Sequence, residues 1–475
     1  MKPIGIFCAV LAAALTMSAQ TWTPLTNQPK IGASTSLLLT DGRVLVQDYG
    51  ARDWWTLTPD LTGSYLNGTW KRAGSLPKGY APVYYASAVL PDGRVIIQGG
   101  EYNLELEVWT TLGAIFAPSN NKWAAVAAPS GWTTVGDAQS VVLANGTFMV
   151  ADCCTVDEAL LDAANLTYAP TGAGKADIND EEGWTLLPNG KVLTVDANCG
   201  ACLSSEIYNP ASGSWSSAGS TGVELIDLPT DEVGPAVLRP DGTVLATGAT
   251  GHNAIYNPKK NKWSAAPDFP KNSKGLQLVM ADAPAAVLPD GNVLCMTSPN
   301  VYGIGVEFLE WDGTNFNPVP DTPNGPQEPS YYGRMLVLPT GQIMLTDGSK
   351  DVEIYTAAGA ANPAWAPVVT SVPSTLKHGA TATLSGMQLN GLTQGAFYGD
   401  DAQSATNYPL IRITNVATGH VFYARTFNPS SMGVATGSTV VTASFEVSTK
   451  TERGPSQLEV VANGIASVPV SVTIQ

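Results

Sequence analysis

Residues 37–46, LLLTDGRVLV, join two apolar runs through a turn that contains Asp41 and Gly42. An Asp-Gly or Asn-Gly pair between apolar runs is a strong signal for a tight β-hairpin. The stretch recurs six times, and its turn glycines are 51, 53, 44, 52, 49 and 50 residues apart. The further copies are AVLPDGRVII (88–97), VVLANGTFMV (141–150), TLLPNGKVLT (185–194), AVLRPDGTVL (236–245), AVLPDGNVLC (286–295) and LVLPTGQIML (336–345).

A hairpin repeated about every 50 residues is typical of an all-β, kelch-type propeller, in which each repeat forms one four-stranded blade. The sequence therefore predicts a seven-bladed kelch-type β-propeller over residues 20–365. Residues 21–25 resemble an outermost strand, and we expect them to join the seventh blade and close the ring. Beyond Pro363 the repeat stops, and alternating strands with spaced turns continue to Gln475. This pattern predicts an immunoglobulin-like β-sandwich over residues 366–475.

The first 19 residues have the features of a cleavable signal peptide. Lys2 precedes an apolar run over residues 4–15 that is too short to span a bilayer, and the small residues Ser18 and Ala19 follow it. The mature chain is therefore expected to be secreted. Its net charge of −16 argues against nucleic acid and anionic membranes as partners, because both are bound by cationic surfaces.

Four of the six cysteines are clustered as an adjacent pair, Cys153 and Cys154, and a C-x-x-C pair, Cys199 and Cys202. Export favours disulfides, so these four residues are disulfide candidates, although the spacing leaves the pairing open. A zinc site of four thiolates is the alternative.

One position of the repeat carries an unusual set of side chains. In a propeller the innermost strand of each blade begins near the axis, so residues at one offset before the turn should converge there. Nine residues before each turn glycine (ten in the fifth repeat, which contains the extra Arg239) stand Ala33, Tyr84, Asp137, Glu181, Glu232, Asp282 and Tyr332. We therefore predict that the mouth of the channel is lined by Tyr84, Asp137, Glu181, Glu232, Asp282, Tyr331 and Tyr332.

Four carboxylates around one axis would repel one another. Calcium, which favours carboxylate oxygens, would relieve this repulsion, so Asp137, Glu181, Glu232 and Asp282 are candidate calcium ligands. Two alternatives remain open at this stage. The carboxylates could accept hydrogen bonds from backbone N–H groups or water, or they could recognise a polar or cationic ligand.

The chain resembles the galactose oxidase and glyoxal oxidase family of copper-radical enzymes, which combine a kelch propeller with a C-terminal, immunoglobulin-like early-set domain. The resemblance rests on the repeats, on YYGRMLVLPTGQIMLTDG (331–348) and on ERGPSQLEVVANGIASVPVSVTI (452–474). It covers nearly all of the mature chain.

The resemblance also implies a copper site of two tyrosines and two histidines, one tyrosine being crosslinked to a cysteine. Tyr331 matches one tyrosine, but Tyr332 stands in place of a histidine and Asp137 in place of the crosslinked tyrosine. No cysteine stands at residues 83–85, where the crosslink partner is expected. The terminal-domain histidine belongs to a Thr-His pair whose closest match is Thr426-Phe427, and an alternative alignment offers His420. The copper-radical site is therefore not retained; copper is not expected, and calcium is the candidate cofactor.

Together these features favour a secreted, non-catalytic protein that binds a polar ligand, a glycan, an extracellular polymer or a partner at the acidic channel mouth. Trp54 and Trp55 follow the second strand of the first blade and are candidates for stacking on sugars at the same face. An enzyme that uses the carboxylates or a bound metal is the alternative. A copper-radical oxidase with altered ligands is a third hypothesis.

Overall fold

The computed structural model describes residues 20–475, and the predicted signal peptide over residues 1–19 lies outside these. The described chain is all-β, as predicted, and its helical content is limited to three short 3₁₀ turns, η1 (Gly325–Gln327), η2 (Ser330–Tyr332) and η3 (Pro363–Trp365). No helix within residues 20–475 has the length and apolar character needed to cross a membrane.

Seven antiparallel sheets of the described chain follow the seven repeats. The first sheet contains β2 (Ala33–Leu38), β3 (Val44–Asp48), β4 (Asp53–Thr58) and β5 (Thr69–Ser75), and the second contains β7 (Ala86–Val89), β8 (Val95–Gln98), β11 (Gly113–Ala117) and β12 (Lys122–Val126). The third contains β13 (Ser140–Val142), β14 (Phe148–Ala151), β15 (Glu158–Asp162) and β16 (Thr167–Thr171), and the fourth contains β17 (Thr185–Leu186), β18 (Val192–Val195), β19 (Ser204–Asn209) and β20 (Ser214–Ser220). The fifth contains β21 (Ala236–Leu238), β22 (Val244–Thr247), β23 (Asn253–Asn257) and β24 (Lys262–Ala266).

The sixth and seventh sheets each receive a strand from elsewhere in the chain: the sixth receives β36 (Ala396–Phe397) and the seventh receives β1 (Thr21–Pro24). The sixth contains β26 (Ala285–Val287), β27 (Val293–Pro299), β28 (Glu307–Trp311) and β29 (Phe316–Pro318), with β25 (Leu278–Val279) on β27. The seventh contains β30 (Arg334–Val337), β31 (Ile343–Thr346) and β32 (Glu353–Thr356). Strand β1 (Thr21–Pro24) pairs with β32, Thr21 opposite Thr356, which confirms that the amino-terminal strand joins the seventh sheet.

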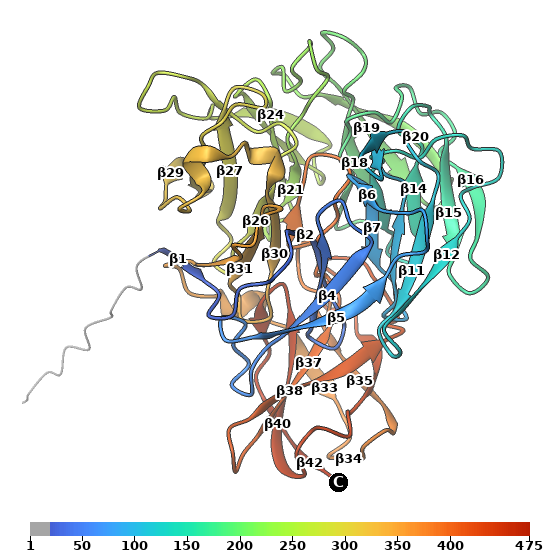
Figure 1. Ribbon diagram of the computed structural model, residues 1–475, viewed down its shortest axis with the longest axis vertical. Coiled ribbons are helices and arrows are strands. Elements are labelled where there is room, and N and C mark those ends of the chain that lie inside the picture. Colours follow the sequence, from blue (N-terminus) through green and yellow to red (C-terminus); the bar gives the residue numbers. More distant parts are fainter. Residues whose placement is uncertain (1–19) are drawn as a thin grey trace, which may run out of the picture.

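The first strands of the seven sheets contact one another in a closed order, from β2 through β7, β13, β17, β21, β26 and β30 back to β2. We call this arrangement the ring (Figure 1). Each turn glycine, from Gly42 to Gly341, has a positive φ between 78° and 91°, a conformation that glycine adopts without a steric penalty. The repeated glycine therefore sets the hairpin of every sheet.

The C-terminal residues form a separate set of strands, which lie together at the lower end of Figure 1. Most of them belong to one nine-stranded sheet of the described chain. These strands are β33 (Val368–Ser371), β34 (Thr375–Leu376), β35 (Thr381–Met387), β37 (Leu410–Asn415), β38 (Val421–Phe427), β39 (Val441–Glu446), β40 (Gly454–Ala462), β41 (Ile465–Ala466) and β42 (Val470–Ile474).

The C-terminal strands pack on the hairpin-turn end of the ring. The backbone N–H of Val421 donates to the carbonyl of Leu61 at 2.8 Å, and that of Met432 donates to Ala144 at 2.9 Å. A Cβ placed on Gly42 would overlap Tyr423, so this turn lies directly against β38. The opposite end of the ring, where the first strands begin, is left free for a functional site.

Residues 390–408, which we call the axial segment, leave the C-terminal strands and enter the ring. Strand β36 (Ala396–Phe397) pairs with β26, Phe397 opposite Ala285. The hydroxyl of Thr393 donates to Leu238 of the fifth sheet at 2.7 Å, and the side-chain carbonyl of Gln394 accepts from Leu186 of the fourth sheet at 2.8 Å. The axial segment therefore fills the channel that a ring of sheets would otherwise enclose.

Candidate functional site

A pocket of about 700 Å³ lies where the first strands of the ring begin, and we call it the axial pocket. All seven residues predicted for the channel mouth line it: Tyr84, Asp137, Glu181, Glu232, Asp282, Tyr331 and Tyr332. Six of them share the offset before the turn glycine and Tyr331 directly precedes Tyr332, so this offset corresponds to one place in space.

The backbone at three of these positions is strained in the same way. Tyr84, Glu181 and Asp282 have φ values of 53°, 57° and 49°, in the left-handed region that residues with a side chain seldom occupy. Each such residue costs on the order of 1 kcal/mol, and such strain is concentrated at functional sites. In the second, fourth and sixth sheets it directs the side chain of this residue into the axial pocket.

The axial pocket also contains six side chains that the repeat analysis missed. Tyr49 and Glu101 follow the second strands of the first and second sheets, β3 and β8, at different distances from their turn glycines, so a fixed offset could not find them. Tyr102 belongs to β9 (Tyr102–Asn103), which pairs with β6 (Pro82–Val83) and β10 (Leu106–Glu107). The missed lining residues are Tyr49, Glu101, Tyr102, Glu105, Tyr302 and Asp400.

Asp400 reaches the axial pocket from the axial segment. Its side-chain Oδ1 accepts a hydrogen bond from the backbone N–H of Asp401 at 2.6 Å, and Asp401 Oδ2 accepts from the backbone N–H of Tyr85 at 2.8 Å. Thr426 and Phe427, the closest sequence match to the family's Thr-His pair, lie at the other end of the ring, where the N–H of Thr426 donates to Thr40 beside a hairpin turn. The C-terminal part of the chain instead reaches the axial pocket through Asp400.

The tryptophans assigned to the rim are also placed elsewhere. Trp54 is fully buried and packs against Trp123, with ring centroids 5.0 Å apart. Trp55 is partly buried, and neither residue lines the axial pocket. The pair lies in β4, the third strand of its sheet, which is why it stays away from the axis.

The carboxylates of the axial pocket are grouped differently from the predicted calcium site. Oxygen atoms of Glu181, Asp282 and Asp400 lie within 4.8 Å of one another. Asp137 instead forms a group with Asp180 and the sulfur of Cys153. The structure thus divides the four predicted ligands and adds one from the axial segment.

Burial controls the protonation of these groups. It raises the pKa values of Glu181, Asp282 and Asp400 well above the ordinary range for carboxyls, and repulsion from neighbouring carboxylates adds to this effect. Burial raises the pKa of Glu232 to about 7, even though the hydrogen bond that its Oε1 accepts from the Tyr302 hydroxyl lowers it. The axial pocket therefore favours any ligand that brings positive charge.

Arg334 lies among these groups and is 4% exposed. Its guanidinium carbon is 3.7 Å from the ring centroid of Tyr398 and 5.5 Å from that of Tyr84. Its Nη1 donates to the carbonyls of Tyr331 and Gly333 at 2.8 and 2.9 Å. Arg334 thus supports the tyrosine wall of the axial pocket and places a fixed positive charge beside its acidic groups.

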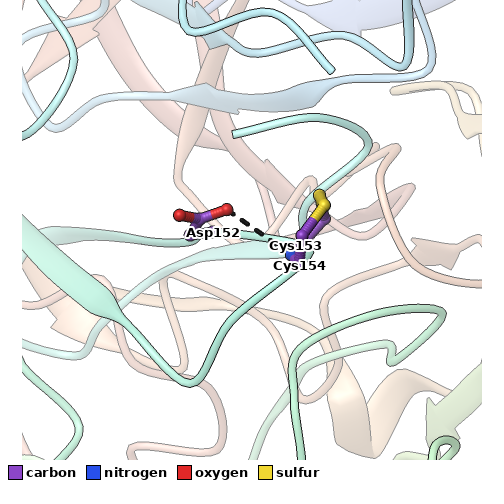
Figure 2. Close-up of side chains that lie close together, drawn as sticks. All are labelled: Asp152, Cys153 and Cys154. Atoms are coloured by element: carbon purple, nitrogen blue, oxygen red, sulfur yellow. Dashed lines mark hydrogen bonds between the residues drawn. A yellow bond between two sulfur atoms is a disulfide. The ribbon is translucent and has the colours of Figure 1, made fainter. Parts of the chain in front are cut away.

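The four candidate cysteines form two disulfides, Cys153–Cys154 and Cys199–Cys202, and the sulfurs are therefore not free to hold zinc as four thiolates. Figure 2 shows the adjacent pair beside Asp152, whose Oδ1 accepts a hydrogen bond from the backbone N–H of Cys154 at 3.4 Å. Because Cys153 also lies near the carboxylate of Asp137, this disulfide borders the axial pocket. Two disulfides fit an oxidising, extracellular environment.

Comparison with known proteins identifies the fold. No protein-family model matches the sequence, and no curated protein matches it. Among solved structures, a fungal alcohol oxidase of the AA5 family in complex with copper is similar over 96% of this chain and 100% of its own, at 14% identity and a TM-score of 0.55. A catalytically inactive virginiamycin B lyase from Staphylococcus aureus with quinupristin matches 71% of this chain and 99% of its own, at 10% identity and a TM-score of 0.50.

The residues of the axial pocket do not fit the copper site that the resemblance to radical oxidases implies. Among the described residues that line it, none is a histidine, a lysine or an arginine. The three histidines lie elsewhere: His252 contacts Asp268, His420 contacts Glu452, and His378 contacts the carbonyl of Thr451. Without imidazole nitrogens the pocket offers oxygen ligands, which are poorly suited to copper and well suited to hard cations.

Buried carboxyls outside the pocket make stability depend on pH. Glu158 is 1% exposed, and both of its oxygens accept from Trp215 Nε1, at 2.6 and 2.8 Å. Burial raises its pKa to about 8, against the Trp215 hydrogen bond and Lys175, which lower it; Glu206 and Asp157 raise it further. The stability that protonated Glu158 contributes is fully present below its unfolded pKa, near 4.5, and is lost as the pH rises through about 8.

We therefore expect the free energy of unfolding to fall between pH 5 and pH 9, and the fall to be smaller in Glu158→Gln by about 4 kcal/mol. Glutamine keeps an acceptor for Trp215 but does not titrate. Urea unfolding at pH 5, 7 and 9, followed by tryptophan fluorescence, measures the difference. Parallel pH curves for the two proteins would contradict the prediction.

Proposed function

We propose that the protein is a secreted, seven-bladed kelch-type propeller protein with an immunoglobulin-like, early-set C-terminal domain. It shares the architecture of galactose oxidase and glyoxal oxidase but not their copper-radical chemistry. Its function is to bind a polar ligand at the axial pocket, without catalysis, and a carbohydrate that carries amino groups is the ligand class that fits best.

One observation carries this proposal: the wall of the axial pocket is made of tyrosines and carboxylates. The described lining residues include six tyrosines and seven acidic residues. Tyrosine rings supply flat, apolar faces for sugar rings, with a hydroxyl at one end for hydrogen bonds. Carboxylates accept hydrogen bonds from hydroxyl and ammonium groups and attract positive charge.

The exposed tyrosines lie where an incoming polymer would first make contact. Tyr49, Tyr302 and Tyr332 are 45%, 48% and 42% exposed. Tyr331 packs edge-on against both Tyr302 and Tyr332, with centroid distances of 5.4 and 4.8 Å. The rings of Tyr302, Tyr331 and Tyr332 form a continuous aromatic wall that is already in place before a ligand binds, which lowers the entropic cost of binding.

The test compares two oligomers of the same sugar backbone, one with a free, positively charged amino group on each sugar and one with that group acetylated and neutral. Oligomers of glucosamine are expected to bind at least about tenfold more tightly than oligomers of N-acetylglucosamine, and their binding is expected to weaken with salt. Isothermal titration calorimetry at 0.05 and 0.5 M NaCl measures both effects. Tyr332→Ala should remove most of the affinity, whereas Tyr423→Phe, a change at the opposite end of the ring, should not.

Absence of binding to either oligomer, or equal binding by wild type and Tyr332→Ala, would contradict a carbohydrate site at this pocket. Preference for the N-acetylated oligomer would contradict the role given to the carboxylates. The oxidase alternative is tested with copper-loaded protein, for which no peroxide is expected from alcohols or aldehydes.

A further inference from the structure

We propose that a calcium-type divalent cation binds in the axial pocket, held by Glu181, Asp282 and Asp400. The site uses three of the seven acidic residues counted above, but it binds a metal ion and has its own readouts, so it goes beyond the ligand-binding function proposed above. It also differs from the calcium site predicted from the repeat, because a residue of the axial segment takes the place of Asp137.

The geometry of the three carboxylates suits such an ion. Each contributes an oxygen, and these oxygens lie within 4.8 Å of one another. Ca²⁺ is bound by oxygens at about 2.3–2.6 Å, so ligands on opposite sides of the ion are about 4.6–5.2 Å apart. Mg²⁺ demands near-ideal octahedral geometry and gives up its water reluctantly, so a site made largely of protein carboxylates suits Ca²⁺ better. The three residues leave further coordination positions for water or backbone carbonyls.

A second observation points to a missing partner at this place. Glu232 lines the same pocket and is 3% exposed, yet its Oε2 is buried without any hydrogen-bond partner. Glu181 Oε2 is likewise buried and unpartnered. Buried carboxylate oxygens without donors are costly, and a bound cation would satisfy them. Glu232 therefore offers a further oxygen in the same pocket that a cation could satisfy.

The position of Asp400 gives the ion a structural consequence. Glu181 precedes the first strand of the fourth sheet and Asp282 precedes that of the sixth, whereas Asp400 comes from the axial segment. An ion shared by these residues would tie the C-terminal part of the chain to two non-adjacent sheets of the ring. Binding of the ion should therefore stabilise the whole protein and not one loop.

The experiment uses the full mature chain, freed of metal with a chelator, and adds Ca²⁺ at up to 2 mM, taken as roughly a hundredfold excess over the dissociation constant. We expect a stoichiometric ion by mass spectrometry of metals, and a rise of about 2–5 °C in the midpoint of thermal unfolding. Asp400→Asn should lose both effects. Asp180→Asn changes a neighbouring carboxylate outside the three-residue group and should keep them.

In the absence of metal, the substitution Asp400→Asn should change the thermal unfolding temperature in the opposite direction. Without an ion, three carboxylates in one buried place repel one another, so Asp400→Asn should unfold at a higher temperature than metal-free wild type. With Ca²⁺ present, wild type should equal or exceed the variant. A variant that had merely lost its fold would be less stable under both conditions; in that event Asp282→Asn is measured in the same way.

Equal stabilisation of wild type and Asp400→Asn by Ca²⁺, or no stoichiometric uptake of Ca²⁺ by wild type, would overturn the proposal. Stabilisation by tetramethylammonium but not by Ca²⁺ would also overturn it, because that result would mean that the acidic residues bind an organic cation and not a metal ion. Calcium uptake and oligosaccharide binding are measured in separate experiments, so either proposal can fail while the other stands.

Discussion

Replacement of Arg334 by methionine is expected to lower the free energy of unfolding by about 3–5 kcal/mol, the usual cost of removing one charge from a buried set of opposite charges. Burial alone would lower the pKa of the guanidinium, but the electrostatic influence of Tyr398, Asp401, Tyr84 and Asp282 holds it above its ordinary value, although neither carboxyl is within ion-pair distance. Urea unfolding of the purified variant measures the loss.

Two comparisons separate charge from packing at Arg334. Arg334→Lys keeps the charge but loses the flat stack on Tyr398, so it should lose less stability than Arg334→Met. The loss in Arg334→Met should also be greater at pH 8 than at pH 5, since more of the neighbouring carboxyls are ionised at pH 8. A methionine variant as stable as wild type at pH 8 would show that the acidic groups do not depend on this cation.

Gly183→Ala is expected to cost about 2–3 kcal/mol, the range for overpacking of a closely packed place. A Cβ on Gly183 would overlap the backbone carbonyl of Gly399, and a backbone atom cannot rotate away as the end of a side chain can. The substitution should push the axial segment away from the fourth sheet and separate Asp400 from Glu181. Thermal unfolding and Ca²⁺ uptake of the same preparation measure both effects.

Gly433→Ala is the matched control, because Gly433 also lies between the C-terminal part of the chain and the ring. A Cβ there would meet only the side chains of Ala144 and Ser431 as its nearest neighbours, at 3.1 and 3.2 Å. We expect a loss well below that of Gly183→Ala and an unchanged uptake of Ca²⁺. If both variants lost similar amounts of unfolding free energy, the close approach of Gly183 to the axial segment would not be more important for stability than the contact at Gly433.

The lining of the axial pocket could be predicted from the sequence to the extent that it follows the repeat. A fixed offset from a turn glycine placed Glu181 and Asp282 correctly, because each hairpin has nearly the same length and the first strands converge. The same logic found β1 in the seventh sheet. Local patterns of this kind depend on turn chemistry and period, both of which are written in short stretches of sequence.

The remainder of the site depends on contacts between distant parts of the chain. Asp400 stands in a polar, glycine-containing stretch that has the composition of an ordinary connection between strands, and nothing local tells that it enters the ring. Glu101 and Tyr302 follow second strands, where loop lengths differ from repeat to repeat, so no single offset finds them. Trp54 was misassigned because an aromatic residue near a strand end can equally face a neighbouring sheet.

The pairing of β1 with β32 has a consequence for biosynthesis. The strand that completes the seventh sheet is made first, and its partner Thr356 is made about 335 residues after Thr21. At about 5–20 residues per second, Thr21 waits on the order of 20–70 seconds for its hydrogen-bonding partner. The axial segment is made later still, so the ring must either remain open or admit the segment afterwards. A nascent chain halted before residue 390 would have all seven sheets but no axial segment, and would expose the walls that the finished protein covers, whether or not the ring had closed.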